Sequence, residues 1–356
     1  MPHFEDGVIP AEYSAYIGRK TLLLIGLTGL SVLLLVAAVS MGAVRIPMAD
    51  VLRTLVGQAD NTRLSLIVWN IRLPQALAAI LAGMGLAVAG AVMQSILRNP
   101  LGSPFTLGVS QAGAFGAAFS VMILGSGLMQ SSNAGAVTIL NPWLTTACAF
   151  AFCLLAALVI VGVARLRGAT PEVMVLAGVA LGSLFTAGTM FLQYFANDVQ
   201  LAAMVFWTFG DTARAGWREI GIMAGVVGPA MVFFIANRWS YNAIDAGDET
   251  ARGLGVRVER VRLVGMLAAC VLTATIVSFL GIIGFVGLVC PHMARRMVGD
   301  DHRFLLPASC LLGGALLLAA DTAARLVLAP NMLPVSVLTA FLGAPTFLYL
   351  LIRGRR

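Results

Sequence analysis

The sequence contains long apolar runs that carry no charged residue. A transmembrane helix needs about 20 apolar residues. The stretch from Asn99 to Ala164 has no charged side chain and has room for two such helices. The other runs are Thr21–Val44, Leu73–Leu97, Val173–Asn197, Ile220–Asn237, Leu263–Ala294, Phe304–Ala320 and Leu326–Ile352. We therefore predict an all-α integral membrane protein, residues 1–356 forming a single transmembrane domain with nine clear spans.

Composition excludes a water-soluble fold and a nucleic-acid partner. Hydrophobic residues make up 59% of the chain and charged residues only 11%, whereas soluble domains carry about 25% charged residues. The formal net charge is +7. However, the arginines border apolar runs and form no basic stripe interleaved with aromatics, so they indicate membrane borders and orientation.

The distribution of basic residues raises the predicted count from nine spans to ten. Arg19 and Lys20 precede the first run and place the N-terminus in the cytoplasm. With nine spans the C-terminal arginines would lie outside. A tenth crossing by Gly284–Met297, as a short helix interrupted by Pro291, brings Arg295, Arg296 and Arg303 and also the C-terminus back inside. We therefore expect about ten helices, some short or interrupted, and cytoplasmic termini, the C-terminus carrying Arg353, Arg355 and Arg356.

Two segments do not fit a simple crossing. Val199–Gly210 is too short to span and is predicted to form an interfacial or re-entrant helix on the outer side. The polar segment Gln130–Asn133, together with Pro142, is where we expect the long charge-free stretch to divide into two helices.

The loop Tyr241–Arg262 is the most charged segment between two predicted spans. Gly247 followed by Asp248 is typical of a helix start, with Asp248 as the cap, and Gly255 is typical of a helix stop. Two short helices would then meet at Gly247 and project into the cytoplasm. We interpret this loop as a docking element for a cytoplasmic partner, the alternative being a solvated loop without ordered structure.

The chain lacks the motifs of an enzyme. A phosphate-binding P-loop requires Gly-Lys-Ser/Thr, but the only lysine, Lys20, follows Arg19. His3, His292 and His302 have no paired metal-ligand spacing. We therefore predict no catalytic site, no metal site and no cofactor bound by this chain.

One pair of ionisable residues falls within an apolar run. Asp321 and Arg325 are four residues apart, so they lie on one helix face and can form an ion pair. A buried carboxylate is also what an ion-coupled secondary transporter would require. That alternative stays open, although Asp321 has no second acidic residue nearby.

Five segments of the sequence resemble the FecCD-type permeases, which are the membrane subunits of type II ABC importers for iron–siderophores, haem and vitamin B12. The matching segments are IRLPQALAAILAGMGLAVAGAVMQSILRNPLGSPFTLGVS (71–110), VLAGVALG (175–182), AGDETARGLGV (246–256), GFVGLVCPHMARRMVGDDHRFLLPASCLLGGALLLAADTAAR (284–325) and LPVSVLTAFLGAPTFLYLLIRGR (333–355). They follow one another in order across nearly the whole chain.

The resemblance implies a role for three groups of residues. The loop at 241–262 looks like the coupling helices that insert into the ATPase, with contacts at Asp245, Asp248, Glu249, Arg252, Gly253, Leu254 and Gly255. Arg72 and Arg325 resemble outward arginines that dock a substrate-binding protein. The residues that resemble the cytoplasmic gate are Asn99, Leu101, Thr170, Pro171 and Glu172. Gln75 and Met332 stand where many relatives carry a docking charge, one of each sign.

The resemblance also implies an assembly in the cell inner membrane. It would contain a second permease copy, as a homodimer or a heterodimer, with two ATP-binding subunits that use ATP and Mg²⁺, and a substrate-binding protein. The translocation path would lie between the two permeases. A ferric siderophore is the expected substrate, with cobalamin, haem and oxyanions such as molybdate as alternatives.

Overall fold

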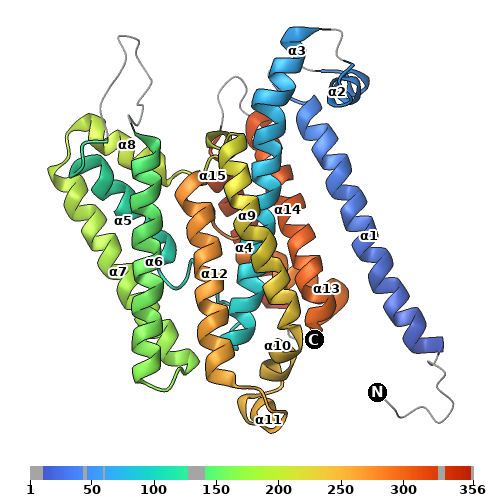
Figure 1. Ribbon diagram of the computed structural model, residues 1–356, viewed down its shortest axis with the longest axis vertical. Helices are drawn as coiled ribbons and strands as arrows, with labels where there is room; N and C mark the ends of the chain where they lie inside the picture. The colour runs from blue at the N-terminus through green and yellow to red at the C-terminus, as the bar shows by residue number, and fades with distance from the viewer. Residues whose placement is uncertain (1–10, 43–45, 59–60, 127–140, 328–332, 354–356) are drawn as a thin grey trace.

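The computed structural model describes residues 11–42, 46–58, 61–126, 141–327 and 333–353, and its main feature is a bundle of ten helices that run alternately up and down (Figure 1). These helices are α1 (Ala11–Ser40), α4 (Leu73–Ile96), α5 (Val109–Met122), α6 (Pro142–Leu166), α7 (Pro171–Phe195), α9 (Trp217–Ala236), α12 (Val258–Leu280), α13 (Val286–Val298), α14 (His302–Val327) and α15 (Val335–Arg353). Seven candidate spans are long and apolar enough to cross a membrane, and α5 and α15 are shorter apolar helices. The predicted all-α membrane fold is confirmed.

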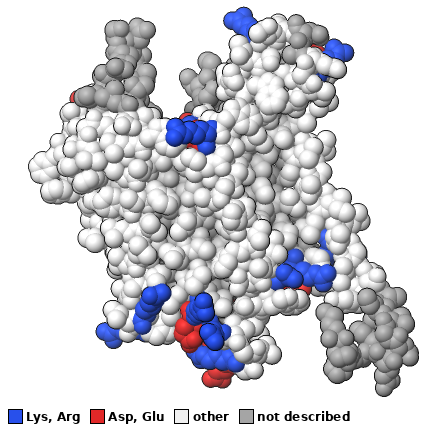
Figure 2. All heavy atoms as spheres, in the orientation of Figure 1, with Lys and Arg blue, Asp and Glu red and all other residues white. Residues whose placement is uncertain are grey.

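Short elements gather at the two ends of the bundle (Figure 1). The upper end holds α2 (Met48–Leu55), α3 (Thr62–Ile67), the π-turn η1 (Val68–Arg72), α8 (Asp198–Thr208) and the 3-10 turn η2 (Thr212–Arg214). The lower end holds α10 (Arg238–Asp245) and α11 (Asp248–Gly253). In Figure 2 the charged side chains on the visible face also gather at these two ends and leave an uncharged belt between them. This is the distribution that a bilayer imposes, because charges in its core are costly.

The predicted short crossing corresponds to α13, which has 13 residues and contains Pro291. At 1.5 Å per residue it is about 20 Å long, less than the hydrocarbon core of about 30 Å. The non-helical link 281–285 precedes α13 and lengthens this segment, and it begins at Gly281 with φ +81° and ends at Phe285 with φ +66°. The end of α8 supports this link, since Phe209 forms an isolated bridge with Ile282. Irregular backbone at membrane depth requires such enclosure by protein.

Other predicted segments are placed as follows. The predicted interfacial helix at Val199–Gly210 is α8, which lies at the upper end beside the bundle (Figure 1). The ends Ala11 of α1 and Arg353 of α15 both lie at the lower end. Gln130–Asn133, Met332, Arg355 and Arg356 fall outside the described residues.

Helix α4 is the core of the bundle, and nearly all of its side chains are buried against α9, α12, α13 and α14. Glycines allow this close approach. A Cβ on Gly83 would lie 2.1 Å from the carbonyl oxygen of Gly313 in α14, and a Cβ on Gly90 would lie 1.8 Å from that of Gly287 in α13. Small residues at helix crossings let backbones pack directly in membrane proteins.

We predict that Gly90→Ala separates α4 from α13 and destabilises the fold by about 1–3 kcal/mol or more, as overpacking does. The measurement is thermal unfolding of the purified protein in detergent. The matched control is Gly162→Ala in α6, where a Cβ would meet no atom within 4 Å and where alanine favours the helix by roughly 0.5–1 kcal/mol. Equal melting temperatures for the two variants would contradict this account of the core.

Candidate functional site

Helices α10 and α11 form a small projection at the lower end of the molecule (Figure 1). They meet at Gly247, whose φ of +120° lies in the region that favours glycine. Ile244 of α10 and Ala251 of α11 are buried together with Val258 at the start of α12. The two predicted helices and their junction at Gly247 are therefore confirmed, and the projection is an ordered unit rather than a solvated loop.

The ends of α11 differ from the prediction at one residue. Gly255, with φ +81°, follows the helix and ends it as expected. Asp248, however, is the first helical residue, and Gly247 occupies the cap position without a side-chain cap. The Asp248 carboxylate instead accepts hydrogen bonds from Nη2 of Arg262, at 3.0 and 3.1 Å. An unpaired buried guanidinium costs more free energy than an uncapped helix end, so the Asp248 side chain points inward to Arg262.

Arg262 is only 2% exposed and joins several segments. Its Nε donates to the carbonyl oxygen of Ile96 at 2.7 Å, and its Nη1 donates to that of Ala169 at 3.2 Å. Ile96 is the last residue of α4, and Ala169 directly precedes the cap of α7. Arg262 was expected only to end the charged loop, and these contacts could not be predicted because both carbonyl partners are distant in the chain.

The predicted gate residues lie directly beyond these two carbonyls. After α4, Asn99 Oδ1 accepts a hydrogen bond from the backbone of Leu101 at 2.9 Å, and Leu101 is exposed. Before α7, Thr170 is the helix cap, Pro171 is the first helical residue and Glu172 lies exposed in the first turn. The structure thus brings the flanks of the two predicted gate segments to one arginine. Their role as a gate stays a prediction.

Asp245, predicted as a coupling contact, ties α10 to the bundle. Its Oδ2 lies 2.8 Å from Nε2 of the buried His302 at the start of α14, and its Oδ1 accepts a hydrogen bond from Ser95 of α4 at 2.7 Å. Burial alone raises the pKa of Asp245, but the hydrogen bonds from His302 and Ser95, together with the charges of His302 and Arg295, outweigh it and hold the pKa below its ordinary value. The carboxylate is therefore an internal anchor.

Most of the predicted coupling contacts on α11 and at its carboxyl end are exposed. Leu254 is 70% exposed, and Glu249, Arg252, Gly253 and Gly255 are also exposed. Arg252 forms an ion pair with Glu259 of α12, with Nη2 2.6 Å from Oε1, and its side chain stays 53% exposed. Glu249, Arg252 and Leu254 are thus the side chains that a partner at this end would meet first.

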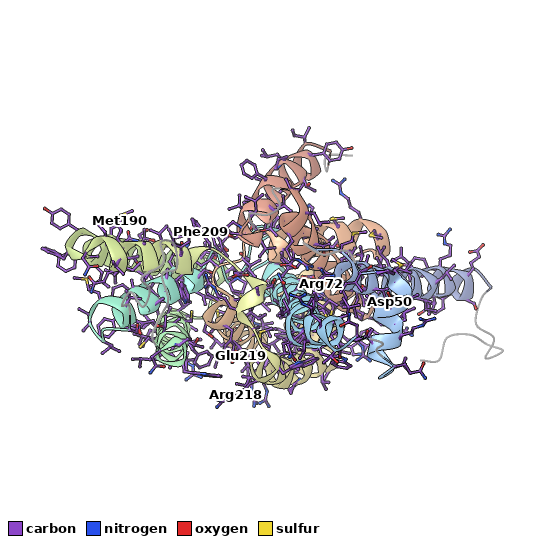
Figure 3. All side chains as sticks on the ribbon, turned by 90° about the horizontal axis from the view of Figure 1, so that it is seen from above. Asp50, Arg72, Met190, Phe209, Arg218 and Glu219 are labelled. Atoms are coloured by element: carbon purple, nitrogen blue, oxygen red, sulfur yellow. The ribbon has the colours of Figure 1, made fainter. Side chains whose placement is uncertain are left out.

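At the upper end, Arg72 and Arg325 were expected to point outward, but the structure places both inside the subunit. They are 5% and 9% exposed, and Figure 3 shows Arg72 among the helices. Nη1 of Arg72 donates to the carbonyl oxygens of Val39 and Ser40 at 2.8 and 3.0 Å, and Nη2 of Arg325 donates to that of Ala38 at 3.4 Å. The two arginines therefore bind the carboxyl end of α1, where a helix favours positive charge.

The expected ion pair between Asp321 and Arg325 is confirmed, with Oδ2 3.1 Å from Nε. The other carboxylate oxygen accepts hydrogen bonds from Thr212 of η2 and from Gln75 of α4. Gln75, which departs from the family pattern, thus has an internal partner. Asp321 is buried and joins α14 to α4 and η2.

Other arginines are exposed at the upper end. Arg63 and Arg218 are exposed, and Figure 3 shows Arg218 and Glu219 toward the rim. The Arg218 guanidinium lies over the ring of Trp143, 4.4 Å from its centroid. Trp143 also lines a cavity of about 410 Å³, together with the aromatic side chains of Phe206, Trp207 and Phe279 and the charged side chains of Arg214 and Glu219. Tryptophan and arginine at this level are typical of a membrane–water border.

No group of three His, Cys, Asp or Glu side chains within the described ranges is close enough to hold a metal ion. The five cysteines, Cys148, Cys153, Cys270, Cys290 and Cys310, are unpaired thiols. The geometry therefore offers two sites of interest, a projection at the lower end and an internal ion-pair cluster at the upper end.

The chain matches a family model described as the FecCD transport family over residues 30–353. It is 53% identical over 347 residues to a candidate ABC transporter permease of Methanocaldococcus jannaschii, covering 97% of this chain and 98% of the relative. It is 35% identical over 326 residues to the hemin transport system permease HmuU of Yersinia pestis, covering 92% and 94%. The structure resembles a candidate metal-chelate type ABC transporter in an inward-facing conformation, with a TM-score of 0.80, 27% identity and coverage of 94% of this chain and 99% of that chain.

We predict that Asp321→Asn destabilises the protein by about 3–5 kcal/mol, because removal of one partner leaves a buried arginine without its counter-charge. The control is Asp211→Asn, which removes a half-exposed carboxylate 4.0 Å from Arg214 and is expected to change stability by less than about 1 kcal/mol. Thermal unfolding in detergent measures both. Similar small changes in the two variants would show that the Asp321 cluster is not structural.

Proposed function

Because the chain belongs to the FecCD transport family, we propose that it is the permease subunit of an ATP-driven importer that moves a bulky metal chelate from a binding protein into the cytoplasm. The observation that carries this proposal is the family match over residues 30–353 on a membrane fold that also presents the α10–α11 projection. The relation to a hemin permease and the likeness to a metal-chelate transporter support this substrate class.

The proposed assembly contains two permeases and two ATP-binding subunits, with a binding protein on the outer face. ATP and Mg²⁺ would be used by the ATP-binding subunits, and we propose no cofactor on this chain. The lower end in Figure 1 would be cytoplasmic, since Arg19, Lys20 and the arginines in the last turn of α13 border it. On this orientation, both termini lie in the cytoplasm of a cell whose inner membrane contains the importer.

The second permease would pack beside α7, with the translocation path between the two copies. Helix α7 is largely uncovered in a single subunit and exposes large apolar side chains, among them Leu184, Phe191 and Tyr194. A homodimer is the simpler arrangement, and a heterodimer with a related permease would use the same face. A wide path between subunits suits a bulky chelate.

The ATPase would contact α11 through Glu249 and Leu254. Leu254 offers an exposed apolar anchor on a polar projection, and such anchors in partner pockets carry much of the binding energy at interfaces. The carboxylates of Asp248 and Asp245 bind other parts of this chain, so we assign them to the internal support of the projection. Arg252 pairs with Glu259 but its side chain is 53% exposed, so we propose it as a further direct contact.

Docking of the binding protein at the outer face would use charge. Direct pairing by Arg72 and Arg325 stays a prediction, and it requires these buried side chains to become exposed. Arg63 and Arg218 are already exposed on the same face, and we propose them as the arginines that meet acidic residues of the binding protein. Exposed charges of this kind steer encounter and fix orientation.

A ferric siderophore is the proposed substrate, with haem, cobalamin and molybdate as alternatives. An ion-coupled secondary transporter is less well supported by the geometry. It would require Asp321 to exchange a proton or an ion, but this carboxylate is held by Arg325, Thr212 and Gln75.

We predict that Leu254→Asp weakens association with the ATP-binding subunit by about tenfold or more, since it places a charge in an apolar contact. Co-purification of the complex and ATP-dependent uptake measure the effect. The matched control is Leu166→Asp at the end of α6, also a highly exposed leucine at the lower end, which is expected to leave association unchanged. Equal effects of both changes would exclude a specific role for α11.

We also predict that vesicles containing permease, ATP-binding subunits and binding protein accumulate a ferric chelate only when ATP is present. A panel of ferric siderophore, haem, cobalamin and molybdate, tested first for affinity to the binding protein, identifies the substrate. Vesicles with the permease alone are the control. Accumulation by the permease alone under a proton or sodium gradient would contradict the proposal and favour the secondary transporter.

A further inference from the structure

The side chain of Arg262, in the first turns of α12, contacts three other segments of the chain. Its guanidinium binds the Asp248 carboxylate in α11, the Ile96 carbonyl at the end of α4 and the Ala169 carbonyl just before the cap of α7. The side chain is almost completely buried, so water does not compete for these donors. The ion pair with Asp248 leaves the carboxylate side chain 26% exposed. One end of this network is thus internal and the other end is at the surface.

The guanidinium is planar, and its donors are fixed relative to one another. A displacement of Asp248 that keeps the ion pair must therefore rotate or translate the whole group. Either movement changes the hydrogen bonds to Ile96 and Ala169 at the same time. A lysine could follow Asp248 with a single ammonium but could not hold both carbonyls in this geometry.

The two carbonyls are next to bends in the backbone. Arg98 follows the end of α4 with φ +46°, and Gly168 and Ala169 precede α7 with φ +82° and +51°. Residues other than glycine seldom adopt such angles, and they persist where surrounding contacts hold them. The bonds from Arg262 are contacts of this kind, adjacent to Asn99 and Thr170 of the predicted gate.

We propose that Arg262 is a positioning residue that transmits movement of α11 to both gate segments. When the ATP-binding subunits move α11, the ion pair with Asp248 carries the displacement to the carbonyls of Ile96 and Ala169. The ends of α4 and α7 then shift together, which a gate made of both segments requires. The inference rests on the proposed function, because it concerns how that importer couples ATP to opening of the path.

The test uses the complete importer in vesicles and measures ATP hydrolysis and uptake in the same sample. Asp248→Asn preserves the shape of the side chain but removes the charge that binds Arg262, and Arg262→Lys preserves the charge but removes the rigid fork. We expect each assembled variant to retain ATP hydrolysis within about twofold, while uptake per ATP falls about tenfold, within the usual range of coupling between sites. The control is Arg260→Lys, an exposed arginine two residues earlier.

A second measurement separates transmission from stability. Spin labels at Leu101 and Glu172 report the distance between the two gate segments. With ATP this distance is expected to change in the otherwise unaltered complex but not in Asp248→Asn. If Arg262→Lys does not assemble, Asp248→Asn alone decides the question. Unaltered uptake per ATP and an unaltered distance change in Asp248→Asn would overturn the inference, whereas absence of ATP-driven uptake by the unaltered complex would overturn the proposed function itself.

Discussion

The close contact of α4 with α13 and α14 determines where the rest of the molecule lies. Gly83 and Gly90 place the α4 backbone against the backbones of its neighbours, so this helix has a fixed depth and rotation in the bundle. The clusters around Asp321, Asp245 and Arg262 each include an end of α4. Gln75 contacts Asp321 near its beginning, and Ser95 and Ile96 contact Asp245 and Arg262 near its end. The packing of α4, which contains no charged residue, thus fixes the positions of the charged residues on the neighbouring elements.

Buried charges occur near both ends of the bundle, and the structure satisfies them within the chain. In a membrane no water is available to solvate an unpaired charge. The buried arginines therefore donate hydrogen bonds to backbone carbonyl oxygens and pair with carboxylates. This explains why Arg72 and Arg325 are not exposed as the family resemblance implied. They bind the last carbonyls of α1, which packs mainly against α14 and depends on such contacts for its position.

Local features of the fold could be predicted from the sequence, whereas long-range side-chain partners could not. The charge-free runs gave the helices, the border arginines required the short crossing at α13, and Gly247 and Gly255 marked the ends of α11. The pair Asp321–Arg325 followed from helical periodicity. By contrast, Arg262 binds Ile96 and Ala169, which are 166 and 93 residues away. Only tertiary packing brings such groups together, and it also turned Asp248 from a cap into an ion-pair partner.

The Asp321 cluster at the upper end and the Asp248–Arg262 cluster at the lower end differ in how accessible they are to a partner protein. At the upper end, the carboxylate of Asp321 is buried and binds Arg325, Thr212 and Gln75 of the same chain, so it offers no exposed contact to an external partner. At the lower end, Asp248 belongs to a two-turn helix that is held mainly by Ala251 and by the guanidinium of Arg262. A small element with few buried contacts moves at lower free-energy cost than a packed helix. The buried ion-pair partner of Asp248, Arg262, is also the residue that binds the carbonyls at the ends of α4 and α7, which is why the proposed coupling enters the molecule at the lower end.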